Sequence, residues 1–171
     1  MRAPRPGDGA TPDALIAALI RRRETVACAE SLTGGRLVAG LIDVPGASAA
    51  VRGGIVAYHA DLKASLVGVD PAVLARPGGS VQEEVAVRLA RGARERCGAT
   101  WGLGTTGVAG PDPCDGAPVG TVFVAVRGPG AERAVRLAVE GDRAQIRAAS
   151  VAAAHRLLAE QLGLLAEQLG A

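Results

Sequence analysis

Aromatic side chains are scarce in this sequence, which has one Trp, one Tyr and one Phe among 171 residues. Hydrophobic residues nevertheless make up 49% of the chain, so a core has to be built mainly from Val, Leu, Ile and Ala. The length suits one globular domain with one core. We therefore expect a single domain over residues 11–171, preceded by a flexible, Pro- and Gly-rich N-terminus over residues 1–10.

Paired cysteines and clustered histidines are also missing. Cys28, Cys97 and Cys114 form an odd set without a C-x-x-C spacing, and the two histidines lie far apart, which argues against a disulfide framework or a zinc site. This cysteine usage favours the reducing cytoplasm. No apolar run approaches the roughly 18 residues of a membrane span, and the N-terminus has no secretory core, so we expect a cytoplasmic protein without membrane contact.

A strong excess of one charge is absent too, because the formal net charge is only +2. The arginines are spread along the chain, apart from the run Arg21–Arg23, which we interpret as the solvated end of a first helix. A nucleic-acid partner is therefore not expected.

Apolar residues recur with helical and strand periodicity in alternation along the chain. Helix starts are predicted at Thr11-Pro12-Asp13, near residues 34 and 60, at Asp70-Pro71, near Val81 and at Asp142. Strands are predicted over residues 25–29, 53–58 and 99–105, with a hairpin over 121–139. This order predicts a mixed sheet covered by helices on both faces.

The C-terminus carries the segment LLAEQLG twice in succession, over residues 157–163 and 164–170. We interpret the repeat as an extended, frayed end of the last helix, since the glycine in each copy weakens a helix by about 1 kcal/mol. A dimer contact built on a short coiled-coil seam is the alternative.

Familiar nucleotide-binding and nucleophile motifs are lacking. GLGTTG over residues 102–107 fits G-x-G-x-x-G, but the prolines of the following VAGPDP forbid the helix that a dinucleotide fingerprint needs. There is no P-loop, and neither G-x-S-x-G nor S-x-x-K surrounds Ser31.

Ser31 nevertheless stands at a position typical of ligand sites, between a predicted buried strand and a predicted helix. The residues that follow it, Thr33, Gly34 and Gly35, offer backbone amides to an anion or a developing oxyanion. Capping of the helix by Ser31 or Thr33 is the alternative interpretation.

Lys63 is the only lysine of the chain, and lysine, unlike arginine, can lose its proton and act as a base. It follows the only tyrosine, Tyr58, by five residues. A Ser31–Lys63 pair is therefore one hypothesis, although a chain this rich in arginine could leave its one lysine anywhere.

Five blocks of the sequence resemble, in the same order, the C-terminal domain of competence-damage-inducible protein A, a family that also occurs alone as nicotinamide-nucleotide amidohydrolase. The blocks are AESLTGG (29–35), GGIVAYHADLK (53–63), TTGVAGP (105–111), PVGTVFVAV (118–126) and GDRAQIR (141–147). The resemblance implies a three-layer α/β/α sandwich with a mixed, mostly parallel sheet of about five strands. It also implies hydrolysis of the carboxamide of nicotinamide mononucleotide to nicotinate mononucleotide and ammonia, and a homodimer.

By the same resemblance, Ser31 is the nucleophile, Lys63 its base and Tyr58 an accompanying hydroxyl that could return a proton to the departing ammonia. We expect an acyl-enzyme whose oxyanion is held by the amides of Gly34 and Gly35, or by those of the Thr106–Gly107 turn.

Arg143 and Arg147, four residues apart on one predicted helix, are the candidates for the substrate's phosphate, with pairing to nearby acids as the alternative. The hydroxyls of Thr105 and Thr106 are further candidates for substrate binding, with loop capping as the alternative. The expected chemistry requires no metal and no cofactor.

Two positions depart from the family's pattern. Gln82 stands where a serine often precedes the long helix, so we expect Ser80 to take over as the helix cap. His59 replaces a small polar residue and is interpreted as a surface residue. Two other functions stay open: a non-catalytic nucleotide-binding or regulatory domain, and an amidase for a different pyridine nucleotide.

Overall fold

A computed structural model describes residues 10–165 of the chain, so residues 1–9 of the expected flexible N-terminus lie outside the described part. Its centre is a five-stranded sheet in the order β2-β1-β3-β4-β5. The strands are β1 (Val26–Glu30), β2 (Val51–Val56), β3 (Trp101–Gly107), β4 (Thr121–Gly128) and β5 (Ala131–Ala138). β1 pairs in parallel with β2 and β3, whereas β4 pairs antiparallel with β3 and β5. Only β4 therefore opposes the other strands, which confirms the predicted mixed, mostly parallel sheet.

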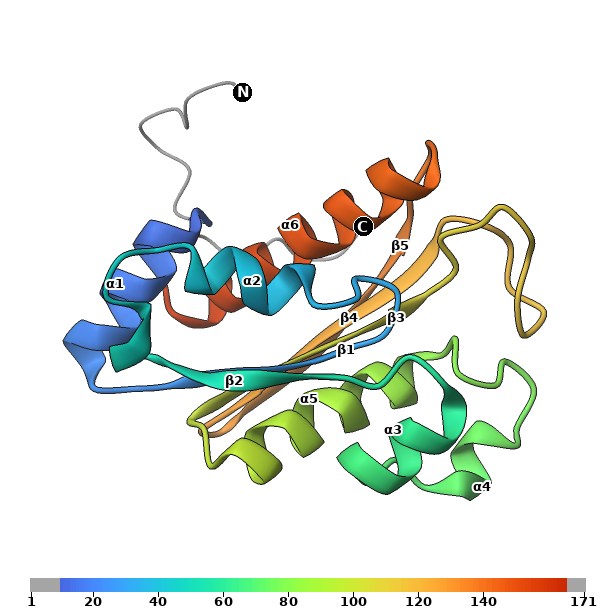
Figure 1. Cartoon of the computed structure of the whole chain (residues 1–171), viewed down its shortest axis with the longest axis horizontal. Coiled ribbons are helices and arrows are strands. Elements are labelled where there is room, and N and C mark those ends of the chain that lie inside the picture. The colour runs from blue at the N-terminus through green and yellow to red at the C-terminus, as the bar shows by residue number, and fades with distance from the viewer. Residues whose placement is uncertain (1–9, 166–171) are drawn as a thin grey trace.

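Helices cover both faces of this sheet and give the three layers expected from the resemblance (Figure 1). One face is covered by α1 (Pro12–Arg22), α2 (Arg36–Ile42) and α6 (Arg143–Gln161), and a short 3-10 helix, η1 (Ala47–Ala49), precedes β2. The other face carries α5 (Glu83–Cys97), with α3 (Ala60–Val67) and α4 (Pro71–Leu74) packed beside it. Among the described helices, none is both long and apolar enough to cross a membrane.

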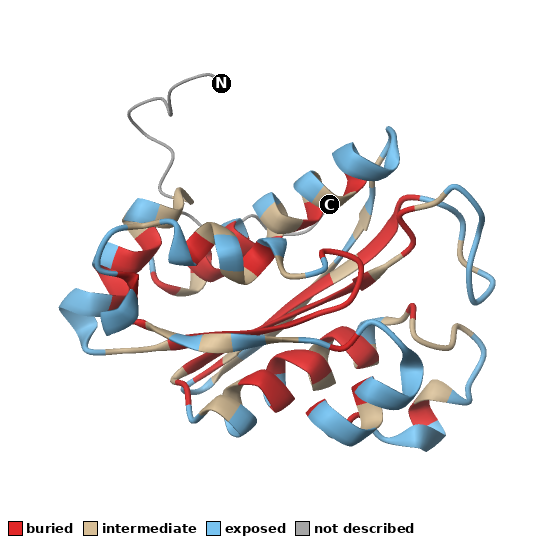
Figure 2. Cartoon of the chain, viewed as in Figure 1, coloured by how far each residue is buried: buried red, intermediate tan, exposed pale blue. Residues whose placement is uncertain are grey.

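The hydrophobic core is divided between the two faces of the sheet. Figure 2 shows the buried residues gathered where the helices of each layer face the sheet. Leu37 of α2 and Ile146 of α6 pack against Leu103 and Val124 of the sheet on one side. On the other side, α5 packs against small residues such as Ala29. Aliphatic side chains thus supply the core that the scarcity of aromatic residues predicted.

Glycines in β3 allow α5 to approach the sheet closely. A Cβ atom on Gly102 would overlap the Ala90 carbonyl oxygen, and one on Gly104 would overlap the Ala86 carbonyl oxygen. The G-x-G-x-x-G pattern over residues 102–107 therefore lies within a strand and serves helix–sheet packing.

The last helix is shorter than expected. α6 ends at Gln161, where Gly163 adopts a left-handed φ of 68° and its N–H donates to the Glu160 carbonyl. This is a glycine-based helix end, so the prediction that the helix continues into the second LLAEQLG copy is wrong for residues 162–165. Residues 166–171 lie outside the described part of the chain.

Candidate active site

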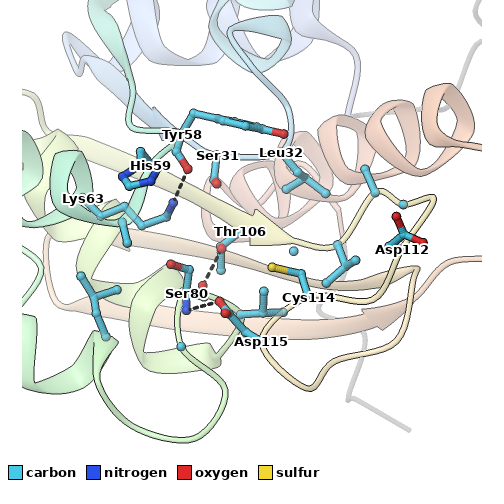
Figure 3. A pocket seen from close by; sticks show the side chains of 18 of the residues that line it. Ser31, Leu32, Tyr58, His59, Lys63, Ser80, Thr106, Asp112, Cys114 and Asp115 are labelled. Atoms are coloured by element: carbon cyan, nitrogen blue, oxygen red, sulfur yellow. Dashed lines mark hydrogen bonds between the residues drawn. The ribbon is translucent and has the colours of Figure 1, made fainter.

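A pocket of about 420 Å³ opens at the carboxyl ends of β1 and β3 (Figure 3). Its walls come from the turn after β1, the connection from β2 to α3, the end of β3, the segment before α5, and the loop between β3 and β4. Ligand sites of open α/β sheets collect at this edge because the loops after parallel strands meet there. The residues that line this pocket form the candidate site.

Ser31 follows β1 directly and lines the pocket. Its N–H donates to the Thr105 carbonyl at 3.0 Å, and its carbonyl accepts the Gly34 N–H at 3.1 Å, so both backbone groups are fixed by neighbours. The residue is 7% exposed, and Figure 3 draws no hydrogen bond from its hydroxyl to any other pocket residue. The hydroxyl is therefore held in place by the backbone and is available to a ligand.

Lys63 reaches the same pocket from α3 and is only 1% exposed. Its amine donates to the Tyr58 carbonyl at 2.9 Å. Burial lowers the pKa of the amine below its ordinary value, while the nearby Asp115 and Cys114 act in the opposite direction more weakly. Figure 3 shows the amine and the Ser31 hydroxyl facing one pocket without a hydrogen bond between them. The site thus combines a confined hydroxyl with an amine that is more easily deprotonated than an exposed lysine.

Glu30 is a fully buried carboxylate that sequence reasoning did not single out. Its two oxygens accept the N–H groups of Gly35, Leu37 and Val38 at 2.9, 3.1 and 2.9 Å. Amides at the start of a helix have no acceptor within the helix, and Glu30 supplies one for these three. The carboxylate thereby ties the end of β1 to α2 and fixes the turn that carries Ser31. Because the Gly34 and Gly35 amides already have acceptors, neither is free to bind the expected oxyanion.

Three of the expected substrate-binding residues support this turn from outside the pocket. The hydroxyls of Thr33 and Thr105 are fully buried and bond to each other at 2.8 Å. The Arg147 guanidinium donates to the Leu32 and Thr33 carbonyls at 2.8 and 2.9 Å. These contacts brace the Ser31 turn against β3 and α6, and the three side chains do not line the pocket.

Three other expected residues, Thr106, Gly107 and Arg143, do line the pocket. The Thr106 hydroxyl donates to the Ser80 carbonyl at 2.6 Å. Arg143 donates to the Gly110 carbonyl at 2.8 Å and to the Tyr58 hydroxyl at 3.2 Å. The guanidinium therefore stands at the pocket with part of its hydrogen-bonding capacity already used.

The Gly107 amide is aimed at the edge of β3 where Ser31 lies. The Thr105 carbonyl on that edge accepts the Ser31 N–H, and residues i and i+2 of a strand direct their backbone groups to the same edge. The Ser31 carbonyl, which would receive the Gly107 N–H if the ladder continued, accepts from Gly34 instead. Gly107 is thus the expected oxyanion donor that the backbone geometry favours.

Tyr58 and His59 lie at the rim of the pocket. Tyr58 is 59% exposed, and its hydroxyl contacts Arg143, whereas its carbonyl contacts the Lys63 amine. The His59 side chain is 81% exposed and its Nδ1 pairs with Asp61 at 2.7 Å. His59 is therefore a surface residue, as interpreted from the sequence.

The sequence did not point to the acidic side of the pocket. Asp115 lines it and accepts the Ser80 N–H at 2.7 Å, and Cys114 and Asp112 come from the same loop. The dipeptide Asp115-Gly116 was the available signal, because Asp-Gly is a strong marker of a tight turn. The expectation that Ser80 caps α5 is wrong, since the N-cap is Gln82 and its side chain makes no capping bond.

No group of three or more His, Cys, Asp or Glu residues that could hold a metal ion occurs within residues 10–165.

Comparison with known proteins places the chain in a family. Residues 10–162 match the CinA C-terminal domain. The chain belongs to this family. A CinA-like protein of Frankia casuarinae is 47% identical over 157 residues, and one from Anaeromyxobacter is 48% identical over 148 residues. These matches cover 91% and 86% of this chain but 36% of each relative, so the chain spans about a third of their length.

Solved CinA structures share the fold. A CinA superfamily protein from Klebsiella pneumoniae is 30% identical and superposes with a TM-score of 0.84, covering 91% of this chain and 96% of that one. A competence/damage-inducible protein from Agrobacterium tumefaciens is 30% identical with a TM-score of 0.85, covering 95% of this chain and 99% of that one. This chain therefore shares the fold of these solved CinA proteins over nearly all of its length.

Proposed function

We propose that this CinA domain hydrolyses the carboxamide of nicotinamide mononucleotide to nicotinate mononucleotide and ammonia through an acyl-enzyme on Ser31. One observation supports the proposal most strongly: the unpartnered Ser31 hydroxyl shares a pocket with Lys63, whose pKa is lowered by burial. A serine needs an adjacent base to become a nucleophile, and a desolvated lysine can serve as that base.

In the first step, neutral Lys63 removes the proton of Ser31 as Oγ bonds to the carboxamide carbon. A neutral amine has two N–H bonds and one lone pair. The Tyr58 carbonyl occupies one N–H at 2.9 Å, which limits the rotation of the amine and leaves its lone pair for the serine proton. Catalytic hydrogen bonds often form only with substrate bound, so the missing Ser31–Lys63 bond of the substrate-free pocket is compatible with this step.

The carboxamide oxygen becomes an oxyanion in the same step, and the Gly107 N–H is our assigned donor. It lines the pocket and is directed at the edge of β3 beside Ser31. A single donor of this kind contributes about a hundredfold to a thousandfold to the rate.

In the second step, the C–N bond breaks and the Lys63 ammonium gives its proton to the departing nitrogen, which leaves as ammonia. Lys63 then takes a proton from water as the water oxygen bonds to the acyl carbon. The bond between that carbon and Oγ breaks, and Lys63 gives the proton to Oγ, which restores the Ser31 hydroxyl and releases the acid. We assign the returned proton to Lys63 because the Tyr58 hydroxyl, the other candidate, lies at the rim against Arg143. Tyr58 contributes through its carbonyl and through its place beside the expected phosphate.

The substrate suits the pocket in size and charge. A volume of about 420 Å³ lies within the range of small-molecule sites. The positively charged pyridinium ring withdraws electrons from the carboxamide and makes its carbon easier to attack. Arg143 is our assigned partner for the phosphate, since a guanidinium can donate to phosphate oxygens.

The direct test is to incubate the chain with nicotinamide mononucleotide and to measure ammonia and nicotinate mononucleotide together. We expect equal amounts of both products, and no product from Ser31→Ala. Tight binding of the nucleotide without product would instead favour a regulatory binding domain. Faster turnover of another pyridine nucleotide in the same assay would reassign the substrate, and sedimentation of the same sample tests the homodimer implied by the resemblance.

A further inference from the structure

The pocket is lined by side chains of opposite charge that come from different elements of the fold. Asp115 lies against the segment before α5, where its carboxylate accepts the Ser80 N–H. Arg143 begins α6 and is fixed by the Gly110 carbonyl and the Tyr58 hydroxyl. Asp115 comes from the loop between β3 and β4, so a negative and a positive side chain reach the pocket wall from separate parts of the fold.

The backbone holds Asp115 in a defined place. Cys114 and Ala117 exchange backbone hydrogen bonds around a two-residue turn formed by Asp115 and Gly116, whose φ angles are 52° and 75°. Left-handed φ at both central positions is the geometry that Asp-Gly turns adopt. Gly79 makes room for the carboxylate, because a Cβ atom there would come within 2.5 Å of Asp115 Cγ. The turn and this glycine together fix the carboxylate at the pocket wall (Figure 3).

Asp115 lines the same pocket as Ser31 and Lys63, so its carboxylate lies near the reacting groups. Its negative charge opposes the lowering of the Lys63 pKa by burial. Ser31 is 7% exposed, and its hydroxyl has no partner among the pocket residues drawn in Figure 3, so it marks where a ligand carbonyl has to lie. A ligand attached at that point displaces water between itself and Asp115, which strengthens their electrostatic interaction.

We propose that Asp115 is a specificity-determining residue that selects carboxamides attached to a positively charged ring, while Arg143, from another part of the pocket wall, receives an anionic group. The inference rests on the proposed function and defines its substrate class by charge: a ring-cation carboxamide with an anionic substituent. A carboxamide on a neutral ring of the same shape loses the attraction of Asp115 and binds more weakly.

The test measures binding without turnover. In Ser31→Ala, calorimetry compares nicotinamide mononucleotide with its reduced form, whose ring is neutral but which keeps the carboxamide, ribose and phosphate. We expect the oxidised form to bind about fivefold more tightly, which corresponds to about 1 kcal/mol. Adding Asp115→Asn keeps an oxygen acceptor for the Ser80 N–H and removes the charge, so the preference is expected to disappear.

Asp112→Asn is the matched control. It removes the same charge from the same loop and the same pocket, but it is Asp115, not Asp112, that is fixed by the Ser80 N–H. Loss of the preference in Asp115→Asn alone supports the proposal. Equal binding of both nucleotides by Ser31→Ala, an unchanged preference in Asp115→Asn, or an equal loss in Asp112→Asn overturns it. Failure of the proposed function itself has a separate readout, which is the absence of ammonia release by the unaltered chain.

Discussion

Because Lys63 is the only lysine, its protonation can be followed directly. In a chain labelled with ¹³C-lysine, the Cε resonance of this one residue reports its titration without overlap. Burial lowers its pKa from the ordinary value, so we expect the midpoint of the titration to lie below 10.5 in the folded protein. Urea-unfolded protein, or a short peptide over residues 59–67, provides the reference for an exposed lysine.

The same shift predicts how stability depends on pH. Between the lowered pKa and 10.5, the unfolded chain binds the Lys63 proton more tightly than the folded chain, so the free energy of unfolding rises with pH in this window. Each unit of pKa difference is worth about 1.36 kcal/mol. Lys63→Met removes this dependence and one hydrogen bond to the Tyr58 carbonyl, worth about 1 kcal/mol. Its stability relative to the unaltered chain is therefore highest at neutral pH and declines as the pH approaches 10.5.

The rate of turnover should depend on the protonation state of Lys63. Loss of a general base costs about 10²-fold to 10⁴-fold in rate, so Lys63→Met and Lys63→Arg should both lose turnover, because arginine keeps its proton. In the unaltered chain, kcat/KM should rise with pH along a limb that matches the titration of the lysine resonance. A midpoint at or above 10.5, or turnover by Lys63→Arg close to that of the unaltered chain, would refute the reasoning.

Three further predictions concern the frame around the site. Glu30→Gln leaves some of the three amides at the start of α2 without an acceptor, so urea unfolding should show a loss of about 2–3 kcal/mol, and kcat should fall because the Ser31 turn loosens; unchanged stability would contradict this role. Gly104→Ala places a methyl group against the backbone of α5 and should lower the free energy of unfolding by about 2–3 kcal/mol. In Gly40→Ala the new atom meets only an ordinary contact, so this variant should stabilise α2 by about 0.5–1 kcal/mol. Equal effects of the two variants would argue against close packing of α5 on β3. Arg143→Met should raise KM for the mononucleotide with little change in kcat and leave KM for the phosphate-free riboside unaltered, so an equal rise for both would remove Arg143 as the phosphate partner.

The fold was largely predictable because its elements carry their own signals. The buried strand predicted over residues 25–29 is observed as Val26–Glu30. The last helix begins where it was predicted to begin, with Asp142 as its N-cap. The end of that helix was harder to predict, since LLAEQ favours a helix in both copies and the glycine that closes each copy could either weaken the helix or end it. The helix stops because Gly163 takes the left-handed conformation that other residues avoid.

The candidate site was predictable where its chemistry depends on residue type, and less so where it depends on the direction in which a side chain or backbone amide points. Ser31 and Lys63 stood out by position and by rarity, and both line the pocket. The amides of Gly34 and Gly35 looked equally suitable, but no sequence pattern shows that the buried Glu30 carboxylate turns back onto α2. Asp115 was missed because a turn within a long loop, rather than a helix or strand, brings it to the pocket.

The central claim is that Ser31 carries the acyl group during turnover. The most direct measurement is rapid acid quenching of the chain with nicotinamide mononucleotide, followed by mass spectrometry of its peptides. The account predicts a transient increase equal to nicotinate mononucleotide minus water on the peptide that contains Ser31. An adduct on a different residue, or ammonia release by Ser31→Ala at the rate of the unaltered chain, would contradict it.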